Sequence, residues 1–274
     1  MIAKGTGFPV AMIPGIQGRW EWMAPTIDAM AAGHRVMSVS LNELRPDRER
    51  NGSFLAWMQA LDRVFDNAHE RKVSLVGVSF GGLIAALYAA RRPERVTSLV
   101  LVSPAAPVFV PRRGDTLCLA FPRLALPYFG VRAISRLWPE LHRSRDSWPL
   151  RLQFALEYSR RVIKAPLSPA FAAQWVLEWQ ALNISDDCRR ITAPTLVITG
   201  EPGMDEVVPV AQSLQYLKLI PGAKHAVLEG TGHIGIISKP YRFAEIAGKF
   251  IYEANSVERS GKPVVEEAGV RHAS

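Results

Sequence analysis

The sequence predicts an α/β protein in which a doubly wound, mostly parallel sheet of about six strands carries an inserted helical segment. Two observations favour this fold. Up to Pro104, apolar runs of strand length alternate with stretches of helical periodicity, and strands of the same kind return after residue 193. Between these points the alternation stops. Because such alternation is typical of a parallel sheet covered by helices on both faces, we expect a core of residues 1–103 and 191–252 and an insertion of residues 104–190.

The predicted elements follow the order that a doubly wound sheet requires. Aliphatic and β-branched runs predict strands at residues 8–13, 35–41, 73–78, 96–102, 195–200 and 226–228. Apolar residues three or four positions apart predict helices at residues 22–32, 53–69 and 80–91. Little of the sequence precedes Phe8, so we expect no edge hairpin and a sheet of six strands. The tail, residues 253–274, has too little apolar surface to pack and is expected to be disordered.

A turn of sequence Gly-Val-Ser-Phe-Gly joins the strand at 73–78 to the helix at 80–91, and Ser79 lies at its bend. A serine on so sharp a turn adopts strained backbone angles, and the neighbouring glycines let the strand and the helix close around it. The N–H of Phe80, at the positive end of the helix dipole, is the expected donor to a developing oxyanion. An inert serine in a glycine-rich turn or a phosphate-binding turn is the alternative interpretation.

Two polar candidates fall just beyond strand ends in the second half of the chain. Asp205 follows the strand at 195–200, and His233 follows the short strand at 226–228. Because functional groups of open α/β sheets gather at the carboxyl edge, Ser79, Asp205 and His233 are expected to meet there. A serine needs a base, and the base needs a group that orients it.

These motifs resemble those of the α/β-hydrolases, over about residues 8–252. The resemblance implies that Ser79 is the nucleophile, that His233 is the general base and then the acid, and that Asp205 orients His233. Glu201 and Glu206 are rival acids. Asp205 is favoured over both because the family's aspartate usually stands a residue before a Val/Ile-Val-Pro run, as Asp205 does.

The resemblance also implies a second oxyanion donor in the loop after the strand at 8–13. The expected donor is the N–H of Ile16. The chain departs from the family's pattern here, because Pro14 stands where a histidine is common. Proline has no N–H, so the loop loses hydrogen bonds that a histidine would give it, although the donor itself is kept.

The insertion resembles the helical cap of this family. Caps cover the nucleophile, so its aromatic residues are candidates for the substrate pocket: Trp138, Trp148, Trp175 and Trp179. An aromatic residue at helical spacing is more often part of a core, and we expect only some of these to face the pocket. Residues 104–190 contain thirteen Lys and Arg against seven Asp and Glu. This excess could steer anionic substrates, but a solvated basic face is favoured.

The composition is that of an enzyme without a membrane span. The chain is 48% hydrophobic and has no long uncharged stretch, and its first residues are too few and too polar for a signal peptide, so a cytoplasmic location is expected. Cys118 and Cys188 are expected to be free, partly buried thiols. The formal charge of +8 comes without a nucleic-acid-binding module, so no nucleic-acid partner is expected. The oligomeric state stays open.

The function implied by the resemblance is hydrolysis of a small-molecule carboxylic ester through an acyl-serine intermediate, with no cofactor and no metal. Carbon–carbon bond hydrolases of the same family, which act on vinylogous diketones, and thioesterases are the mechanistic alternatives. Epoxide hydrolases and haloalkane dehalogenases are disfavoured because their nucleophile is an aspartate. A ligand receptor that keeps the triad and turns over slowly is the alternative from a different class. One fold serves many reactions, so the substrate stays open.

Overall fold

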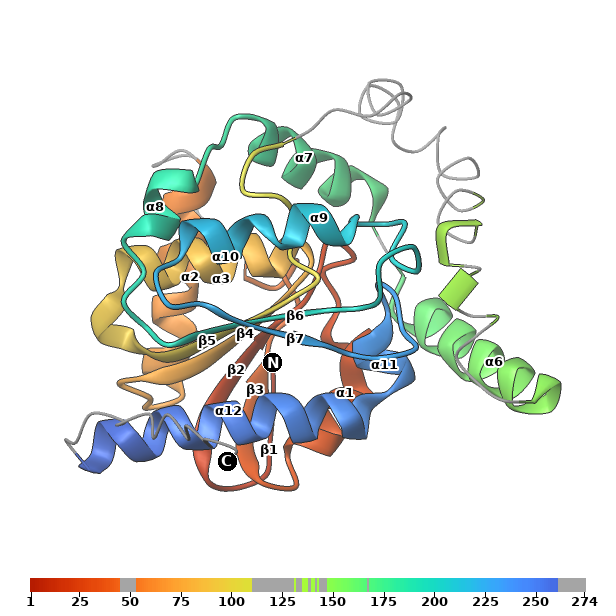
Figure 1. Cartoon of the computed structure of the whole chain (residues 1–274), viewed down its shortest axis with the longest axis horizontal. Helices are drawn as coiled ribbons and strands as arrows, with labels where there is room; N and C mark the ends of the chain where they lie inside the picture. The colour runs from red at the N-terminus through yellow and green to blue at the C-terminus, as the bar shows by residue number, and fades with distance from the viewer. Residues whose placement is uncertain are drawn as a thin grey trace, which may run out of the picture.

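A seven-stranded sheet forms the centre of the protein in the computed structural model (Figure 1), which describes residues 1–44, 53–109, 131, 135–137, 139–140, 142, 147–166 and 168–260. The strands are β1 (Ile2–Lys4), β2 (Phe8–Ile13), β3 (His34–Ser38), β4 (Val73–Val78), β5 (Val96–Val102), β6 (Thr195–Thr199) and β7 (Lys224–Val227). Their order is β1-β3-β2-β4-β5-β6-β7, and every pair is parallel except β1 with β3. The predicted α/β class and mostly parallel sheet are confirmed.

The edge strand β1 was not expected from the sequence, and a sheet of six strands is one strand too few. Ile2 pairs with Ser38 and Lys4 with Val36 in antiparallel register. The chain then passes the start of β3 at Gly5 and Gly7, whose φ angles are +79° and +111°. A Cβ at Gly5 would lie 2.2 Å from the carbonyl oxygen of His34. A strand of three residues is too short to show a periodic pattern in the sequence. It can pair with β3 because the two glycines let the chain turn close to the start of β3.

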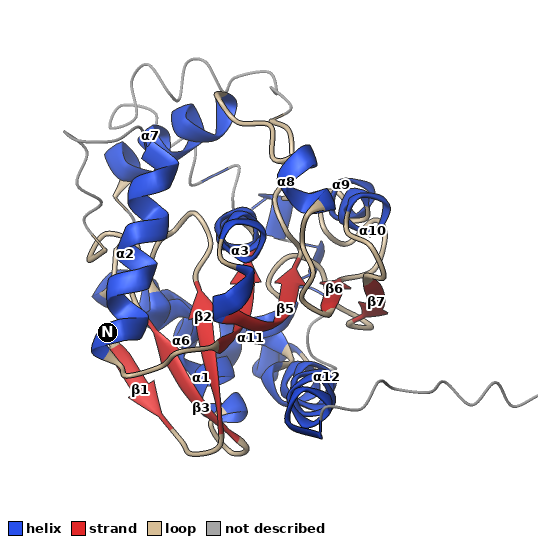
Figure 2. Cartoon of the chain, turned by 90° about the vertical axis from the view of Figure 1, so that its left-hand side faces the viewer, coloured by secondary structure: helices blue, strands red, loops and turns tan. Residues whose placement is uncertain are grey.

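Helices cover both faces of the sheet (Figure 2). In chain order they are η1 (Trp20–Met23), α1 (Ala24–Met30), α2 (Ser53–Asn67), α3 (Phe80–Arg91), η2 (Pro93–Arg95), α6 (Trp148–Lys164), α7 (Pro169–Gln180), α8 (Ser185–Arg189), α9 (Val210–Ser213), α10 (Gln215–Leu219), α11 (Gly235–Ser238) and α12 (Pro240–Ser260). The helices predicted at 53–69 and 80–91 match α2 and α3 closely, and the one predicted at 22–32 is divided between η1 and α1.

Two apolar clusters lie on opposite sides of the sheet. One contains Trp57 of α2 and Tyr88 of α3. The other contains Ile27 of α1 and Phe243 of α12. Residues 80–89 of α3 are all buried, because α3 directly follows the sharp turn at residues 77–81, the elbow, and its alanines and glycines allow close approach to the sheet. This helix fixes the orientation of the turn that carries Ser79.

The helices α6 and α7 follow β5 and precede β6, within the segment predicted to be an insertion, and Figure 1 shows them outside the central sheet. Two tryptophan N–H groups join this part of the chain to the core. Trp22 Nε1 donates to the carbonyl oxygen of Ala165 at 2.8 Å, and Trp57 Nε1 donates to Glu178 Oε2 at 3.2 Å. Within residues 104–190, Trp179 Nε1 donates to the carbonyl oxygen of Ala106 at 3.0 Å.

The last helix is longer than the predicted core boundary at residue 252. α12 continues to Ser260, so the first part of the predicted disordered tail is helical. Phe243, Ala247, Ile251 and Asn255 are buried at intervals of four residues, and Asn255 Nδ2 donates to Ser74 Oγ at 3.0 Å. This apolar stripe explains the continuation of the helix. Residues 261–274 lie outside the described residues, and none of the described helices is long and apolar enough to cross a membrane.

Cys188 is a free, buried thiol, as expected, whereas Cys118 lies outside the described residues. Burial, with a contribution from Asp187, raises the pKa of the Cys188 thiol to about 12. The thiol therefore stays protonated near neutral pH. Because the thiolate is the reactive form, alkylation of the native protein by iodoacetamide at pH 8 should be slower at Cys188, by on the order of 10³-fold, than in the unfolded chain.

Mass spectrometry of the peptide that contains Cys188 measures this rate separately from that of Cys118. The guanidinium-unfolded protein is the control. Equal rates in the two states would contradict the burial of this thiol.

Candidate active site

Ser79 lies on a backbone turn that leaves no room for larger neighbours. Its φ and ψ angles are 53° and −117°, in a region that residues with a Cβ rarely adopt. A Cβ at Gly77 would lie 2.5 Å from the carbonyl oxygen of Gly81, and a Cβ at Gly81 would lie 2.4 Å from the carbonyl oxygens of Ile13 and Pro14. The strained conformation persists because the surrounding backbone is packed this closely.

Three side chains from distant parts of the chain form a continuous hydrogen-bonded chain. His233 Nε2 lies 3.1 Å from Ser79 Oγ, and His233 Nδ1 lies 3.0 Å from Asp205 Oδ2. The carboxylate is nearly closed to solvent, with 1% of its side chain exposed, and the imidazole is 13% exposed. The arrangement fits the tautomer in which Nδ1 carries the hydrogen, which leaves Nε2 free to accept the proton of the serine hydroxyl.

The second oxygen of Asp205 is fixed by the backbone. Asp205 Oδ1 accepts the N–H of Val207 at 3.1 Å and the N–H of Val208 at 2.8 Å. These bonds hold the carboxylate against rotation and leave Oδ2 for the imidazole. The aspartate that precedes the Val-Val-Pro run is therefore both bonded to His233 and oriented by that run.

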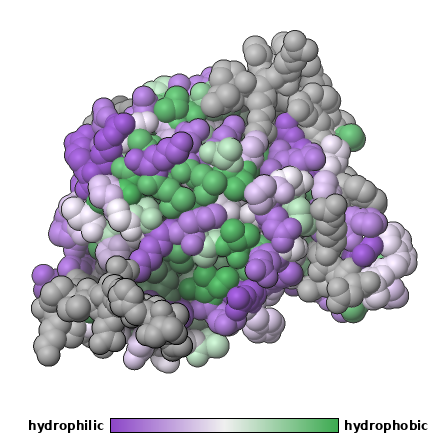
Figure 3. All heavy atoms as spheres, viewed as in Figure 1, coloured by the Kyte–Doolittle hydropathy of each residue, from purple (hydrophilic) through white to green (hydrophobic). Residues whose placement is uncertain are grey.

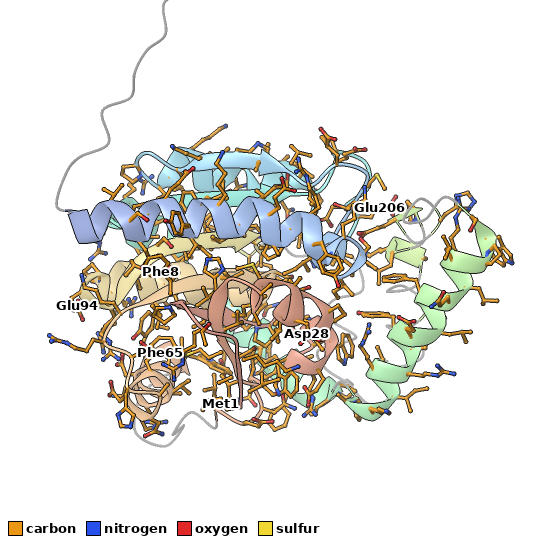
Figure 4. The ribbon with its side chains drawn as sticks, turned by 90° about the horizontal axis from the view of Figure 1, so that it is seen from below. Met1, Phe8, Asp28, Phe65, Glu94 and Glu206 are labelled. Carbon is orange, nitrogen blue, oxygen red and sulfur yellow. The ribbon has the colours of Figure 1, made fainter. Side chains whose placement is uncertain are left out.

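The two rival acids have other surroundings. Glu201 Oε1 accepts the N–H of Gly230 at 2.6 Å, which braces the turn before His233. Glu206 is exposed, and Figure 4 shows it on the side of the core where α6 stands. Asp205 is the acid that the structure brings into hydrogen-bond distance of His233.

The loop after β2 lies directly against the elbow. A Cβ at Gly15 would lie 3.3 Å from Ser79 Cβ, and the N–H of Gly18 donates to the carbonyl oxygen of Gly15 at 2.8 Å. The turn from Gly15 to Gly18 contains Ile16, while Phe80 is the first residue of α3. Both predicted oxyanion donors thus belong to segments that adjoin Ser79, and their roles stay predictions.

Trp175 is the predicted pocket residue that contacts the elbow. It is 1% exposed, and its ring stacks on Phe80 with a centroid distance of 6.1 Å and an interplanar angle of 14°. A Cβ at Gly18 would lie 2.4 Å from the Trp175 ring. The ring therefore packs against both segments that carry the predicted oxyanion donors, Ile16 and Phe80.

The other three predicted pocket residues differ from Trp175. Trp179 makes an edge contact with Phe109 at a centroid distance of 4.8 Å, besides its hydrogen bond to Ala106. Trp148 begins α6 and is 65% exposed. Trp138 lies outside the described residues. Their contact with a substrate stays a prediction.

A buried glutamate lies beside this site without any sequence signature. Glu140 is 0% exposed, and Glu140 Oε2 accepts the N–H of Ile234, next to His233, at 2.8 Å. A single glutamate in the insertion, 94 positions away from its partner, has no spacing that would mark it. Its burial is visible only once the chain is folded.

The profile of the alpha/beta hydrolase fold family matches residues 39–240, so the chain belongs to this family. A curated relative, the 2-hydroxymuconate semialdehyde hydrolase of Pseudomonas sp. (strain CF600), is 29% identical over 267 residues, which cover 92% of this chain and 90% of the relative. The family and this relative place the chain among hydrolases.

Two solved structures share the fold. An esterase from Exiguobacterium antarcticum superposes with a TM-score of 0.72 at 20% identity, covering 92% of this chain and 94% of the esterase. The enol-lactonase from Burkholderia xenovorans LB400 gives a TM-score of 0.74 at 17% identity, with coverage of 92% and 95%. At these identities the likeness concerns the fold alone.

The contact between the elbow and the loop after β2 can be tested with Gly81→Ala. The added methyl group would meet two backbone carbonyl oxygens at 2.4 Å, so the loop must move away from the elbow. We expect a loss of roughly 1–3 kcal/mol in the free energy of unfolding, measured by urea denaturation, together with slower labelling of Ser79 by a fluorophosphonate.

Gly33→Ala is the matched control, because a Cβ at Gly33 would meet nothing within 4 Å. This variant should keep both the stability and the labelling rate of the wild type. Equal behaviour of the two variants would show that the close contact at Gly81 has no influence on the elbow.

Proposed function

We propose that this protein is a serine hydrolase that cleaves a small-molecule carboxylic ester through an acyl-serine intermediate. The observation that most supports the proposal is the hydrogen-bonded chain from Ser79 Oγ through His233 to Asp205, with distances of 3.1 and 3.0 Å. Such a chain activates a hydroxyl group that is otherwise a weak nucleophile.

In the acylation step, Ser79 Oγ attacks the ester carbonyl carbon while His233 Nε2 takes the hydroxyl proton. The resulting oxyanion accepts hydrogen bonds from the N–H groups of Ile16 and Phe80. Asp205 stabilises the positive charge that develops on the imidazole. The tetrahedral intermediate then collapses, the bond to the leaving oxygen breaks, and His233 donates its proton to the departing alcohol.

In the deacylation step, water attacks the acyl carbon and gives a proton to His233. The second tetrahedral intermediate collapses with cleavage of the bond to Ser79 Oγ, which regains its proton from the imidazole. The products are the carboxylic acid and the free enzyme.

Carbon–carbon bond hydrolysis is the second candidate, and one observation favours it. The relative with 29% identity over 92% of this chain is a 2-hydroxymuconate semialdehyde hydrolase. A panel of esters, thioesters and vinylogous diketones separates the candidates. An esterase should show its highest kcat/KM on the esters, and a carbon–carbon bond hydrolase should show it on the diketones. A ligand receptor would instead show ligand-induced stabilisation with almost no turnover.

The proposed triad predicts the behaviour of three variants. Ser79→Ala, His233→Ala and Asp205→Asn should each lower kcat on a short-chain nitrophenyl ester by on the order of 10³-fold or more, because each breaks the same proton-transfer unit. For the same reason the losses should not multiply when the changes are combined. Circular dichroism should show that the fold is kept.

Glu206→Gln is the control for Asp205→Asn, since Glu206 is an exposed acid one residue away. Full activity in Ser79→Ala would refute the proposed nucleophile. If Asp205→Asn keeps full activity and Glu206→Gln is inactive, the acid that orients His233 is Glu206 and not Asp205.

Trp175 provides a test of the pocket. Its ring packs on Phe80, next to Ser79, so the smaller ring of Trp175→Phe should leave space beside the acyl group. We expect relative kcat/KM to move toward longer acyl chains by roughly tenfold, about 1.4 kcal/mol. The measurement is kcat/KM for a series of nitrophenyl esters of increasing chain length.

Leu177→Ala is the control, since it shortens a side chain of the same helix, α7, that is 50% exposed; it should leave the chain-length preference as it is. An equal shift in both variants, or none in Trp175→Phe, would exclude Trp175 from the acyl pocket.

A further inference from the structure

The side chain of Glu140 lies against the backbone on both sides of His233. Glu140 Oε2 accepts the N–H of Ile234 at 2.8 Å, and a Cβ at Gly232 would lie 2.9 Å from the same oxygen. Glu140 Oε1 lies 3.3 Å from the hydroxyl of Ser238, which donates to it. One fully buried carboxylate therefore contacts the histidine loop, residues 232–234, and the helix that follows.

The loop that carries Asp205 also approaches the histidine loop closely. A Cβ at Gly232 would lie 2.3 Å from the carbonyl oxygen of Met204 and 2.9 Å from Glu140 Oε2. Gly232, the residue before His233, thus faces both the residue before Asp205 and the carboxylate of Glu140. Glycine is needed here because neither neighbour leaves room for a side chain.

Burial is the largest influence on Glu140 and raises the pKa of its carboxyl group, as does the negative charge of Asp205. The backbone N–H groups of Ile234 and Gly232 and the nearby His233 act in the opposite direction, but the pKa stays above its ordinary value. The carboxylate form, which accepts the N–H of Ile234, is present above that pKa. In this form Glu140, like Asp205, places a negative charge near the imidazole and stabilises a positive charge on His233.

Glu140 belongs to the insertion, which is also anchored at a second point. Trp22 of η1 makes an edge contact with Tyr158 of α6 at a centroid distance of 5.8 Å and donates its N–H to the carbonyl oxygen of Ala165. Figure 1 shows α11, which follows His233, on the side of the core that faces α6. The insertion is thus joined to the histidine loop through one side chain.

We propose that Glu140 is a positioning residue that fixes the His233 loop from the insertion and stabilises positive charge on the imidazole. This inference rests on the proposed function, because it takes His233 to be the base. The insertion would then contribute to proton transfer as well as to covering the site, because its Glu140 accepts the N–H of Ile234.

Two substitutions separate the hydrogen bonds from the charge. In Glu140→Gln, the amide oxygen can replace Oε2 toward Ile234 while the amide nitrogen donates to the hydroxyl of Ser238, so the hydrogen bonds are kept and the charge is lost. Glu140→Ala removes both. Glu157→Gln is the matched control, since Glu157 is a half-exposed glutamate of α6 with an ion pair to Arg161 at 3.9 Å.

The first readout is the rate of Ser79 labelling by a fluorophosphonate, which reports on the serine and histidine without any choice of substrate. We expect Glu140→Ala to lower this rate and kcat by about 10- to 100-fold with little change in KM, and Glu140→Gln to recover part of the loss. Glu157→Gln should match the wild type.

The second readout is the pH profile of labelling. Loss of a negative charge near His233 destabilises the protonated imidazole, so the acidic limb of the profile should move to lower pH in Glu140→Gln. A residue that only supports the fold would leave this limb in place. Hydrogen exchange at the Ile234 amide is the third readout, and it should become faster in Glu140→Ala while staying slow in Glu140→Gln.

Wild-type labelling rates and pH profiles in both Glu140 variants would overturn the proposal, as would slow exchange at Ile234 in Glu140→Ala. If Glu140→Ala fails to fold, the rate and pH profile of Glu140→Gln decide. Failure of wild-type Ser79 to label would refute the proposed function instead. In that case, exchange at Ile234 still decides whether Glu140 holds the loop.

Discussion

The close approach of the elbow to the loop after β2 is the constraint on which the site depends. Gly81 faces the carbonyl oxygens of Ile13 and Pro14 at a distance that excludes any Cβ, and Ser79 keeps a φ of 53° because of this packing. The strained conformation is maintained because the buried helix α3 follows directly, and its many contacts allow only one backbone path. Together with the pairing of Ile13 and Gly77 in the sheet, this contact fixes Ser79 relative to the loop that contains Ile16.

Parallel strands explain how three distant residues come together. β4, β6 and β7 all end at the same edge of the sheet, so the segments that follow them carry Ser79, Asp205 and His233 to one place. The loops then fix the distances. Asp205 is held by two backbone N–H groups, and the N–H of Glu201 donates to the carbonyl oxygen of Thr231 at 2.9 Å, which links the two loops directly.

The insertion contacts this site in two chemically different ways. Trp175 brings an apolar ring against Phe80, a contact that depends on size and shape. Glu140 brings a buried carboxylate to the backbone beside His233, a contact that depends on charge and hydrogen bonding.

The sequence by itself determined the features that depend on neighbouring residues. The strands at 8–13, 73–78 and 96–102 have the predicted bounds because apolar β-branched runs are local signals, and the Gly-Val-Ser-Phe-Gly turn marked Ser79 for the same reason. Asp205 and His233 could be named because each follows a strand end. The family match covers residues 39–240, which contain all three of these residues.

Only the tertiary structure decided the features that depend on contacts between distant segments. β1 is a strand because Ile2 to Lys4 pair with β3, and nothing in three residues predicts that. The helix α12 continues past residue 252 because Asn255 reaches Ser74 across the fold. Trp175 and Trp148 look alike in sequence, yet one is buried on the elbow and the other exposed, and Glu140 gains its partners only when the insertion meets the histidine loop. Burial of a single side chain is a property of the assembled fold, so no local pattern encodes it.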